Sequence, residues 1–145
     1  GHPVWGVDQN ISAATQTVPQ AHLTEADIEG GPWPLNGADG PQQFGAVVVT
    51  NYLWRPLFPT LLKSVAPGGF LIYETFAAGN ETVGRPARPD FLLQPNELLQ
   101  VCAGMRVIAF ENGFVSEPDR FVQRIVAFAP ALPGDPNPDR ARHVL

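Results

Sequence analysis

The stretch from residue 44 to residue 76, FGAVVVTNYLWRPLFPTLLKSVAPGGFLIYETF, most constrains the fold. Residues 46–49 and residues 70–73 are uninterrupted apolar runs. Such runs are typical of strands that are covered on both faces of a parallel sheet. We therefore predict two central, parallel strands.

The residues between these runs predict the helix that connects them. The apolar side chains at helical spacing are Phe58, Leu61, Leu62 and Val65. Pro56 and Pro59 lie near the expected start of the helix, and Pro67-Gly68-Gly69 is expected to end it. A right-handed crossover would bring the loops at residues 50–55 and 74–80 to the carboxyl edge of the sheet, where open α/β sheets bind ligands.

The size of the chain fits one α/β domain. Its 145 residues are 44% hydrophobic, enough to bury a core. We expect the domain to cover residues 1–130, and residues 131–145 to form a Pro-rich tail.

Composition excludes several classes of function. The net charge of -5 and the scattered lysines and arginines argue against nucleic acid as a partner, so we expect a small-molecule substrate. The sequence contains no apolar run long enough to span a membrane and does not open on a signal-peptide pattern, so we expect a cytoplasmic protein.

Cysteine and histidine usage predicts neither an internal disulfide nor a metal site. Cys102 is the single cysteine, and its place on the apolar side of a predicted helix favours a buried structural thiol over a nucleophile. His2, His22 and His143 lack the spacing of metal ligands.

The flanking segments complete an alternating pattern. Strands are predicted at residues 3–8 and 22–27, each ending on an acid, with a helix at residues 11–18 between them and a loop at residues 30–43 after them. After the central unit, residues 77–90 form a long connection, a length common in binding loops and lids. A helix at residues 95–103 and an antiparallel hairpin of residues 106–115 and 121–129 follow.

This series of elements resembles the later two thirds of a class I S-adenosylmethionine-dependent methyltransferase. The resemblance covers about residues 3–130, and similar small bacterial proteins include those of the tellurite-resistance type. VWGVD, EADIE, VVVTNYLWRPLFP and APGGFLIYETF resemble the second to fifth strands with their loops. The resemblance implies a Rossmann-like α/β sheet, mostly parallel with a C-terminal antiparallel hairpin, and S-adenosylmethionine as cofactor.

The resemblance also implies which residues would bind the cofactor: Asp8, Gln9, Asp27, Ile28, Asn51 and Tyr52. Asp8 would accept hydrogen bonds from ribose hydroxyls, and Asp27 with Ile28 would contact adenine. Four of these residues have a structural alternative. Asp8 would instead cap the next helix, Asp27 would begin a solvated turn, and Asn51 and Tyr52 would be a turn residue and a half-buried aromatic residue.

Four further residues are candidates for substrate contact: Arg55, Glu74, Arg85 and Phe91. A buried Glu74 near Arg55 or Arg85 would alternatively form an ion pair that fixes the loops. Arg85 would alternatively be a solvated loop residue.

The family's first strand, Gly-rich turn and first helix have no counterpart in this sequence. We therefore expect a chain that is truncated at its amino end. Loss of that strand would leave residues 46–49 with an unpaired apolar edge, and we expect a homodimer through this edge rather than an inward shift of the first predicted strand.

Two functions remain open at this point. The first is methyl transfer from S-adenosylmethionine to a small molecule, which needs positioning of the reactants and no catalytic triad. The sequence contains no GxSxG elbow and no Walker loop, which would favour a hydrolase or nucleotidase. The second is a non-catalytic binding module that keeps the methyltransferase fold. An unrelated doubly wound enzyme would need a phosphate-binding Gly-rich loop, which is not found.

Overall fold

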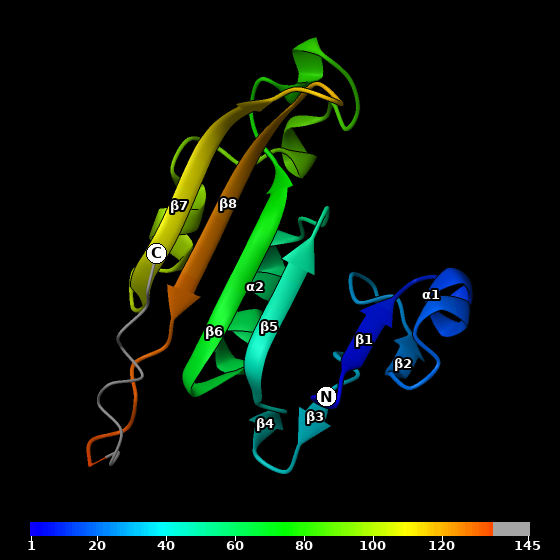
Figure 1. Cartoon of the computed structure of the whole chain (residues 1–145), viewed down its shortest axis with the longest axis vertical. Coiled ribbons are helices and arrows are strands. Elements are labelled where there is room, and N and C mark those ends of the chain that lie inside the picture. The colour runs from blue at the N-terminus through cyan, green and yellow to red at the C-terminus, as the bar shows by residue number, and fades with distance from the viewer. Residues whose placement is uncertain (135–145) are drawn as a thin grey trace. The chain divides into compact units, whose positions relative to one another are not determined.

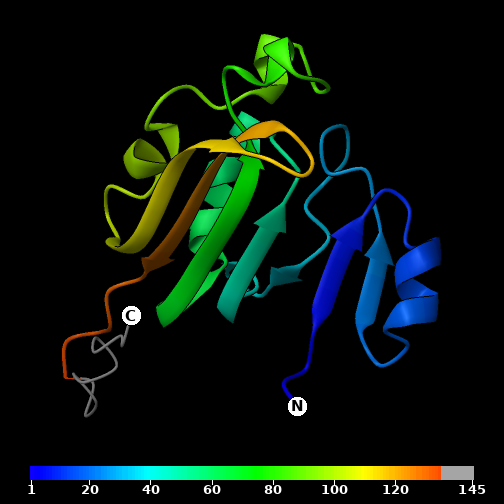
Figure 2. The same cartoon turned by 45° about the horizontal axis from the view of Figure 1, so that its top comes forward.

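The computed structural model describes residues 1–134, and its contacts divide the chain into two compact units (Figures 1 and 2). The first unit comprises Gly1–Gln42 and the second begins at Gln43. Each unit is described by itself. The expected tail falls mainly in residues 135–145, which lie outside the described residues together with His143.

The first unit contains a parallel strand pair and a small hairpin. Strands β1 (Trp5–Asp8) and β2 (His22–Glu25) pair in parallel, and α1 (Ser12–Thr17) connects them. Both strands and the helix were predicted. The expected loop at residues 30–43 also contains a short antiparallel pair, β3 (Asn36–Gly37) with β4 (Gly40–Pro41). Strands of two residues have no periodicity that the sequence could reveal.

The second unit is a four-stranded sheet in the order β5-β6-β8-β7 (Figure 1). Its strands are β5 (Phe44–Thr50), β6 (Val65–Phe76), β7 (Arg106–Val115) and β8 (Arg120–Phe128). β5 and β6 are parallel, while β8 is antiparallel to both β6 and β7. The predicted parallel pair and terminal hairpin are therefore confirmed.

Short helices connect these strands: η1 (Arg55–Leu57), α2 (Phe58–Lys63), η2 (Asn80–Thr82), η3 (Pro89–Phe91) and α3 (Glu97–Val101). Both α-helices are shorter than expected. β6 already begins at Val65 and runs through Pro67-Gly68-Gly69, which we expected to be a stop. Gly68 has a φ of 72°, a conformation that glycine adopts without strain, so the chain can turn within a continuing strand.

The core lies on one face of the sheet. Leu71 and Tyr73 on β6 are paired with Ala127 and Ile125 on β8, and all four are at most 1% exposed. α2 packs against β6 and α3 against β8, so both helices cover this face.

The prediction that residues 46–49 are covered on both faces is wrong. β5 has one strand neighbour among the described residues, β6, and is therefore an edge strand of its sheet. Val48 is 62% exposed, and its register partner Ile72 is 40% exposed. An apolar run indicates that a strand can be buried, but its neighbours decide whether it is.

Among residues 1–134 no helix is long and apolar enough to cross a membrane. The same residues bring together no group of three or more histidine, cysteine, aspartate or glutamate side chains that could hold a metal ion.

Candidate functional site

The carboxyl ends of β1 and β2 bring two of the predicted cofactor ligands to one edge of a sheet. Asp8 is the last residue of β1 and is in register with Glu25, the last residue of β2. Asp27 follows β2 by two residues, so the expectation that this strand ends at Asp27 is wrong. The Nε2 atom of Gln9 donates a hydrogen bond of 3.2 Å to Oδ1 of Asp27, which links the two loops directly.

The Asp8 carboxylate organises the start of the following helix. Its Oδ1 atom accepts a hydrogen bond of 2.8 Å from the backbone N–H of Asn10, and the Oδ1 atom of Asn10 accepts one of 3.0 Å from Ser12. This relay is close to the expected capping role. A carboxylate has two oxygens, so this capping leaves Oδ2 as an acceptor for a hydroxyl group.

Asp27 begins a turn, as its structural alternative proposed. Its Oδ1 atom accepts hydrogen bonds from the backbone N–H groups of Glu29 at 3.0 Å and Gly30 at 3.2 Å. Hydrogen bonds from Gly30 and Glu29 lower the pKa of Asp27. At neutral pH the carboxylate is therefore ionised, and it accepts hydrogen bonds but cannot donate one. A Cβ atom at Gly30 would lie 2.9 Å from Oδ2 of Asp27, so glycine permits this close approach. Ile28, beside this turn, is half-buried.

Carboxylate oxygens such as those of Asp8 and Asp27 are acceptors to which the hydroxyl and amino groups of a nucleoside can donate. A ribose diol would find an acceptor in Asp8, and an exocyclic amino group would find one in Asp27. Ile28 offers an apolar surface next to the second acceptor.

The second unit holds the other predicted residues, at the carboxyl ends of β5 and β6. Asn51 directly follows β5, has a φ of 52° and donates its backbone N–H to the carbonyl oxygen of Glu74 at 2.9 Å. Asparagine is among the residues that tolerate this left-handed conformation best. The Asn51 side chain is exposed, and Tyr52 is half-buried.

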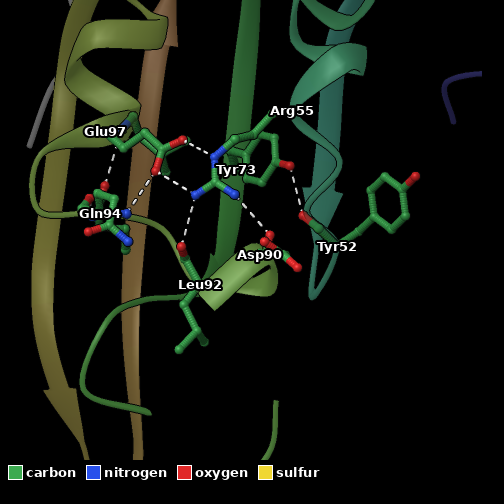
Figure 3. Close-up of polar contacts among 9 residues, drawn as sticks. Tyr52, Arg55, Tyr73, Asp90, Leu92, Gln94 and Glu97 are labelled. Carbon is green, nitrogen blue, oxygen red and sulfur yellow. Dashed lines mark hydrogen bonds and ion pairs between the residues drawn. The ribbon is translucent and has the colours of Figure 1, made fainter. Parts of the chain in front are cut away.

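Arg55 lies in a network of internal contacts (Figure 3). Its Nε and Nη2 atoms donate to both carboxylate oxygens of Glu97 at 2.7 Å and 3.0 Å. Nη1 and Nη2 also donate to the carbonyl oxygens of Asp90 and Leu92 at 2.8 Å and 2.9 Å. These contacts join the segment after β5 to the segment before α3, and the hydrogen bonds with Glu97 raise the pKa of Arg55.

Glu74 has different ion-pair partners from those expected. It pairs with Arg124 at 2.6 Å and Arg120 at 3.4 Å, both on β8, and not with Arg55 or Arg85. Arg124 also pairs with Glu111 at 3.0 Å. The Glu74 side chain is 28% exposed rather than buried, because it lies on the face of the sheet opposite α2 and α3. Contact of Glu74 or Arg55 with substrate stays a prediction.

The connection between β6 and α3 has fixed ends and an exposed middle. Asn80 is 1% exposed, donates to the carbonyl oxygen of Pro86 at 3.0 Å and accepts from the N–H of Phe121 at 3.1 Å. Residues 81–85 and 87–91 are exposed and include Arg85. Arg88 pairs with Asp90 at 3.0 Å and lies 5.3 Å from the ring centre of Phe91, which is 38% exposed.

Sequence reasoning did not identify Tyr73 or Glu97 as part of this site. Tyr73 lies within an apolar strand run and looks like an ordinary core residue, although its hydroxyl group required a partner. Glu97 was noted only as an acid in the first turn of a helix. Its partner Arg55 lies 42 positions earlier in the sequence, which no local pattern reveals.

Comparison with known proteins identifies the fold. No protein-family model matches the sequence, and no curated protein matches it. The N-methyltransferase NodS from Bradyrhizobium japonicum has a TM-score of 0.65 at 15% identity, over 88% of this chain and 74% of NodS. An S-adenosylmethionine-dependent methyltransferase from Methanosarcina mazei has a TM-score of 0.64 at 11% identity, over 91% of this chain and 84% of that one. TehB from Haemophilus influenzae has a TM-score of 0.62 at 16% identity, over 89% of this chain and 50% of TehB. The chain therefore has the fold of class I S-adenosylmethionine-dependent methyltransferases.

Proposed function

We propose that the protein transfers a methyl group from S-adenosylmethionine to a small-molecule acceptor. The observation that carries this proposal is the pair of acceptors at the ends of β1 and β2, on a methyltransferase fold. Asp8 is the last residue of β1 and Asp27 lies in the loop after β2, and the hydrogen bond from Gln9 to Asp27 links the two loops. The solved structures of NodS and of the glycopeptide N-methyltransferase MtfA include complexes with S-adenosylhomocysteine, which supports this cofactor.

In this proposal the residues of the chain bind and orient the reactants. When bound, the cofactor would supply a methyl group on a positively charged sulfur. A lone pair of the acceptor would form a bond to the methyl carbon as the bond between carbon and sulfur breaks. Asp8 would accept hydrogen bonds from the ribose hydroxyls, Asp27 would accept one from the adenine amino group, and Ile28 would pack beside the ring. Asn51 and Tyr52 of the second unit are candidate cofactor contacts by the resemblance alone. Positioning and exclusion of water can supply much of the rate of such a displacement.

The acceptor is proposed to be small and to contact Arg85 and Phe91, which are exposed on the connection before α3. A net charge of -5 supports a small molecule over nucleic acid. The cytoplasmic location expected from the sequence stays a prediction.

A binding module without catalysis is the second candidate. It is favoured by the internal contacts of Asp27, whose Oδ1 atom already accepts three hydrogen bonds from Gln9, Glu29 and Gly30. Fold alone does not decide between the two, because one fold hosts many functions.

Binding of S-adenosylhomocysteine to the 145-residue chain tests the proposal. We expect this ligand to raise the melting temperature, because binding to the folded state alone stabilises it. Asp8→Asn keeps an oxygen that can accept the Asn10 N–H but removes the charge, so binding should weaken by roughly 1.5 to 3 kcal/mol in calorimetry.

Glu25→Gln provides the matched control. Glu25 is the register partner of Asp8 and is exposed, and its substitution should leave the affinity unchanged. If millimolar S-adenosylhomocysteine does not shift the melting temperature of the unmodified chain, cofactor binding is rejected and the binding module becomes the better candidate. Equal weakening by both substitutions would indicate a nonspecific charge effect.

A further inference from the structure

The backbone that follows β5 is held in an unusual conformation at Asn51, which is one of the candidate cofactor contacts. Asn51 has a φ of 52°, and its N–H is bonded to the carbonyl oxygen of Glu74 at 2.9 Å. Asparagine adopts this region at a lower cost than most residues other than glycine, and the contacts of neighbouring residues help to hold it there. The contacts of the neighbouring residues therefore show which groups hold residues 51–55, which are called the segment below.

Tyr73 provides the first of these groups. Its side chain is 1% exposed, and its hydroxyl group donates a hydrogen bond of 2.7 Å to the carbonyl oxygen of Tyr52 (Figure 3). Burial raises the pKa of Tyr73, so the hydroxyl group keeps its proton and remains a donor at neutral pH. The ring of Tyr73 packs against Phe58 of α2, with the centroids 6.0 Å apart, so the donor has a rigid support.

Arg55 provides the second group, three residues after Tyr52. Its bidentate ion pair with Glu97 and its hydrogen bonds to two backbone carbonyls use Nε, Nη1 and Nη2. Glu97 is itself fixed, because its Oε2 atom accepts a hydrogen bond of 2.7 Å from the N–H of Gln94. Arg55 thus anchors the end of the segment to α3 and to the connection before it.

We infer that Tyr73 and Arg55 are positioning residues, which fix the backbone of Asn51 and Tyr52 in the conformation that binds the cofactor. This inference rests on the proposed function. Tyr73 holds the segment by its hydrogen bond to the carbonyl oxygen of Tyr52. Arg55 holds the carboxyl end of the segment, because its side chain pairs with Glu97. Neither has to touch the cofactor. Their loss would lower affinity by reducing the fraction of molecules in the binding conformation.

Tyr73→Phe tests the inference because it removes one hydroxyl group and keeps the ring. Two quantities are measured: the affinity for S-adenosylhomocysteine by calorimetry, and the hydrogen exchange rate of the Asn51 amide by nuclear magnetic resonance. We expect roughly three- to tenfold weaker binding and Asn51 exchange that is faster by a similar factor, the scale of one hydrogen bond. Arg55→Lys, which cannot form the bidentate pair, should act in the same direction.

Cys102→Ala is the matched control. Cys102 is 1% exposed and lies at the end of α3, so its substitution lowers stability without removing a group that touches the segment. It should leave the affinity and the Asn51 exchange rate close to their original values. If Tyr73→Phe and Cys102→Ala weaken binding equally, Tyr73 acts only through overall stability and the inference is overturned.

The Asn51 exchange rate separates this inference from the proposed function. If the unmodified chain does not bind S-adenosylhomocysteine, the proposed function fails, and a positioning role for that cofactor fails with it. Faster Asn51 exchange in Tyr73→Phe would still support Tyr73 as the group that holds the segment. If the unmodified chain binds and Tyr73→Phe neither weakens binding nor accelerates exchange, the inference fails while the proposed function stands.

Discussion

Cys102 lies immediately after α3, in the part of the second unit where that helix meets β8. It is 1% exposed, and burial raises the pKa of its thiol to about 11. The thiolate is the reactive form of cysteine, so this environment opposes both nucleophilic and metal-binding roles. The prediction of a buried thiol is confirmed, and its lack of reactivity remains to be tested.

We expect Cys102 in the native protein to react with a thiol reagent only on unfolding. A short exposure to the reagent should leave the folded chain unmodified, and the same exposure in concentrated denaturant should modify it completely. Mass spectrometry measures the modified fraction. Rapid labelling of the native chain would contradict a buried, protonated thiol.

The same thiol predicts a pH dependence of stability. In the unfolded chain Cys102 ionises near its ordinary pKa of 9.0, whereas in the folded chain it stays protonated up to about 11. Between these values the unfolded state binds fewer protons, so the free energy of unfolding should fall as the pH rises from about 9 to about 11. Tyr73, whose pKa is also raised, contributes to this fall above its ordinary pKa of 10.0. Urea denaturation at several pH values should show a smaller fall for Cys102→Ala.

At the scale of elements, the connection between β6 and α3 is an anchored strap rather than a free loop. Ala77 and Leu93 form an isolated parallel bridge, so the two ends of the strap lie side by side. Gly79 has a φ of 106°, and a Cβ atom there would lie 2.8 Å from the ring of Phe121, so the strap requires glycine at this turn. Anchored ends favour a strap that presents the exposed residues 81–85 and 87–91 in a constant position.

Asn80 should be the most important polar side chain of this strap. Asn80→Ala would leave the N–H of Phe121 and the carbonyl oxygen of Pro86 without a partner. We expect a loss of about 2 to 4 kcal/mol in the free energy of unfolding, the sum of two unsatisfied groups. Asn112→Ala is the control, because Asn112 is exposed on β7 and its substitution should change stability by at most about 0.5 kcal/mol. Similar values for both substitutions in urea denaturation would show that Asn80 does not anchor the strap.

At the scale of the whole molecule, β5 is an edge strand of the four-stranded sheet and can pair with a further strand. β5 is seven residues long and contains no charge and no proline, the features with which natural edge strands prevent pairing. Val48 and Ile72 extend this edge into an apolar surface. We propose that two chains associate through β5.

Light scattering at micromolar concentration should therefore give the mass of a dimer. Val48→Lys places a charge on this edge strand and should shift the equilibrium toward the monomer. Val107→Lys is the matched control, because Val107 is 39% exposed on β7, the opposite edge strand of the same sheet. A monomeric unmodified chain would refute the proposal, and dissociation by Val107→Lys alone would move the interface to β7.

Sequence patterns determined the kinds and order of most elements. Apolar runs, helical spacing and turn residues are local signals, so the parallel pair β5 and β6, the helix between them and the terminal hairpin could be predicted. Periodicity also placed the acids at the ends of β1 and β2, with an error of two residues at Asp27. The resemblance to a methyltransferase rests on this order, and the structural comparison confirms the fold.

Only the tertiary structure decided the partners of these residues. Glu74 pairs with Arg124, 50 positions away, and Arg55 with Glu97, 42 positions away. Exposure of Val48 likewise depends on which elements cover the face of the sheet that it lies on, and not on the apolar sequence of β5. Such contacts depend on how strands and loops distant in the chain pack together, and periodicity within a segment carries no information about that packing. The candidate cofactor residues therefore stay predictions from the sequence, whereas the contacts of Tyr73, Arg55 and Glu97 within the second unit became visible only in the tertiary structure.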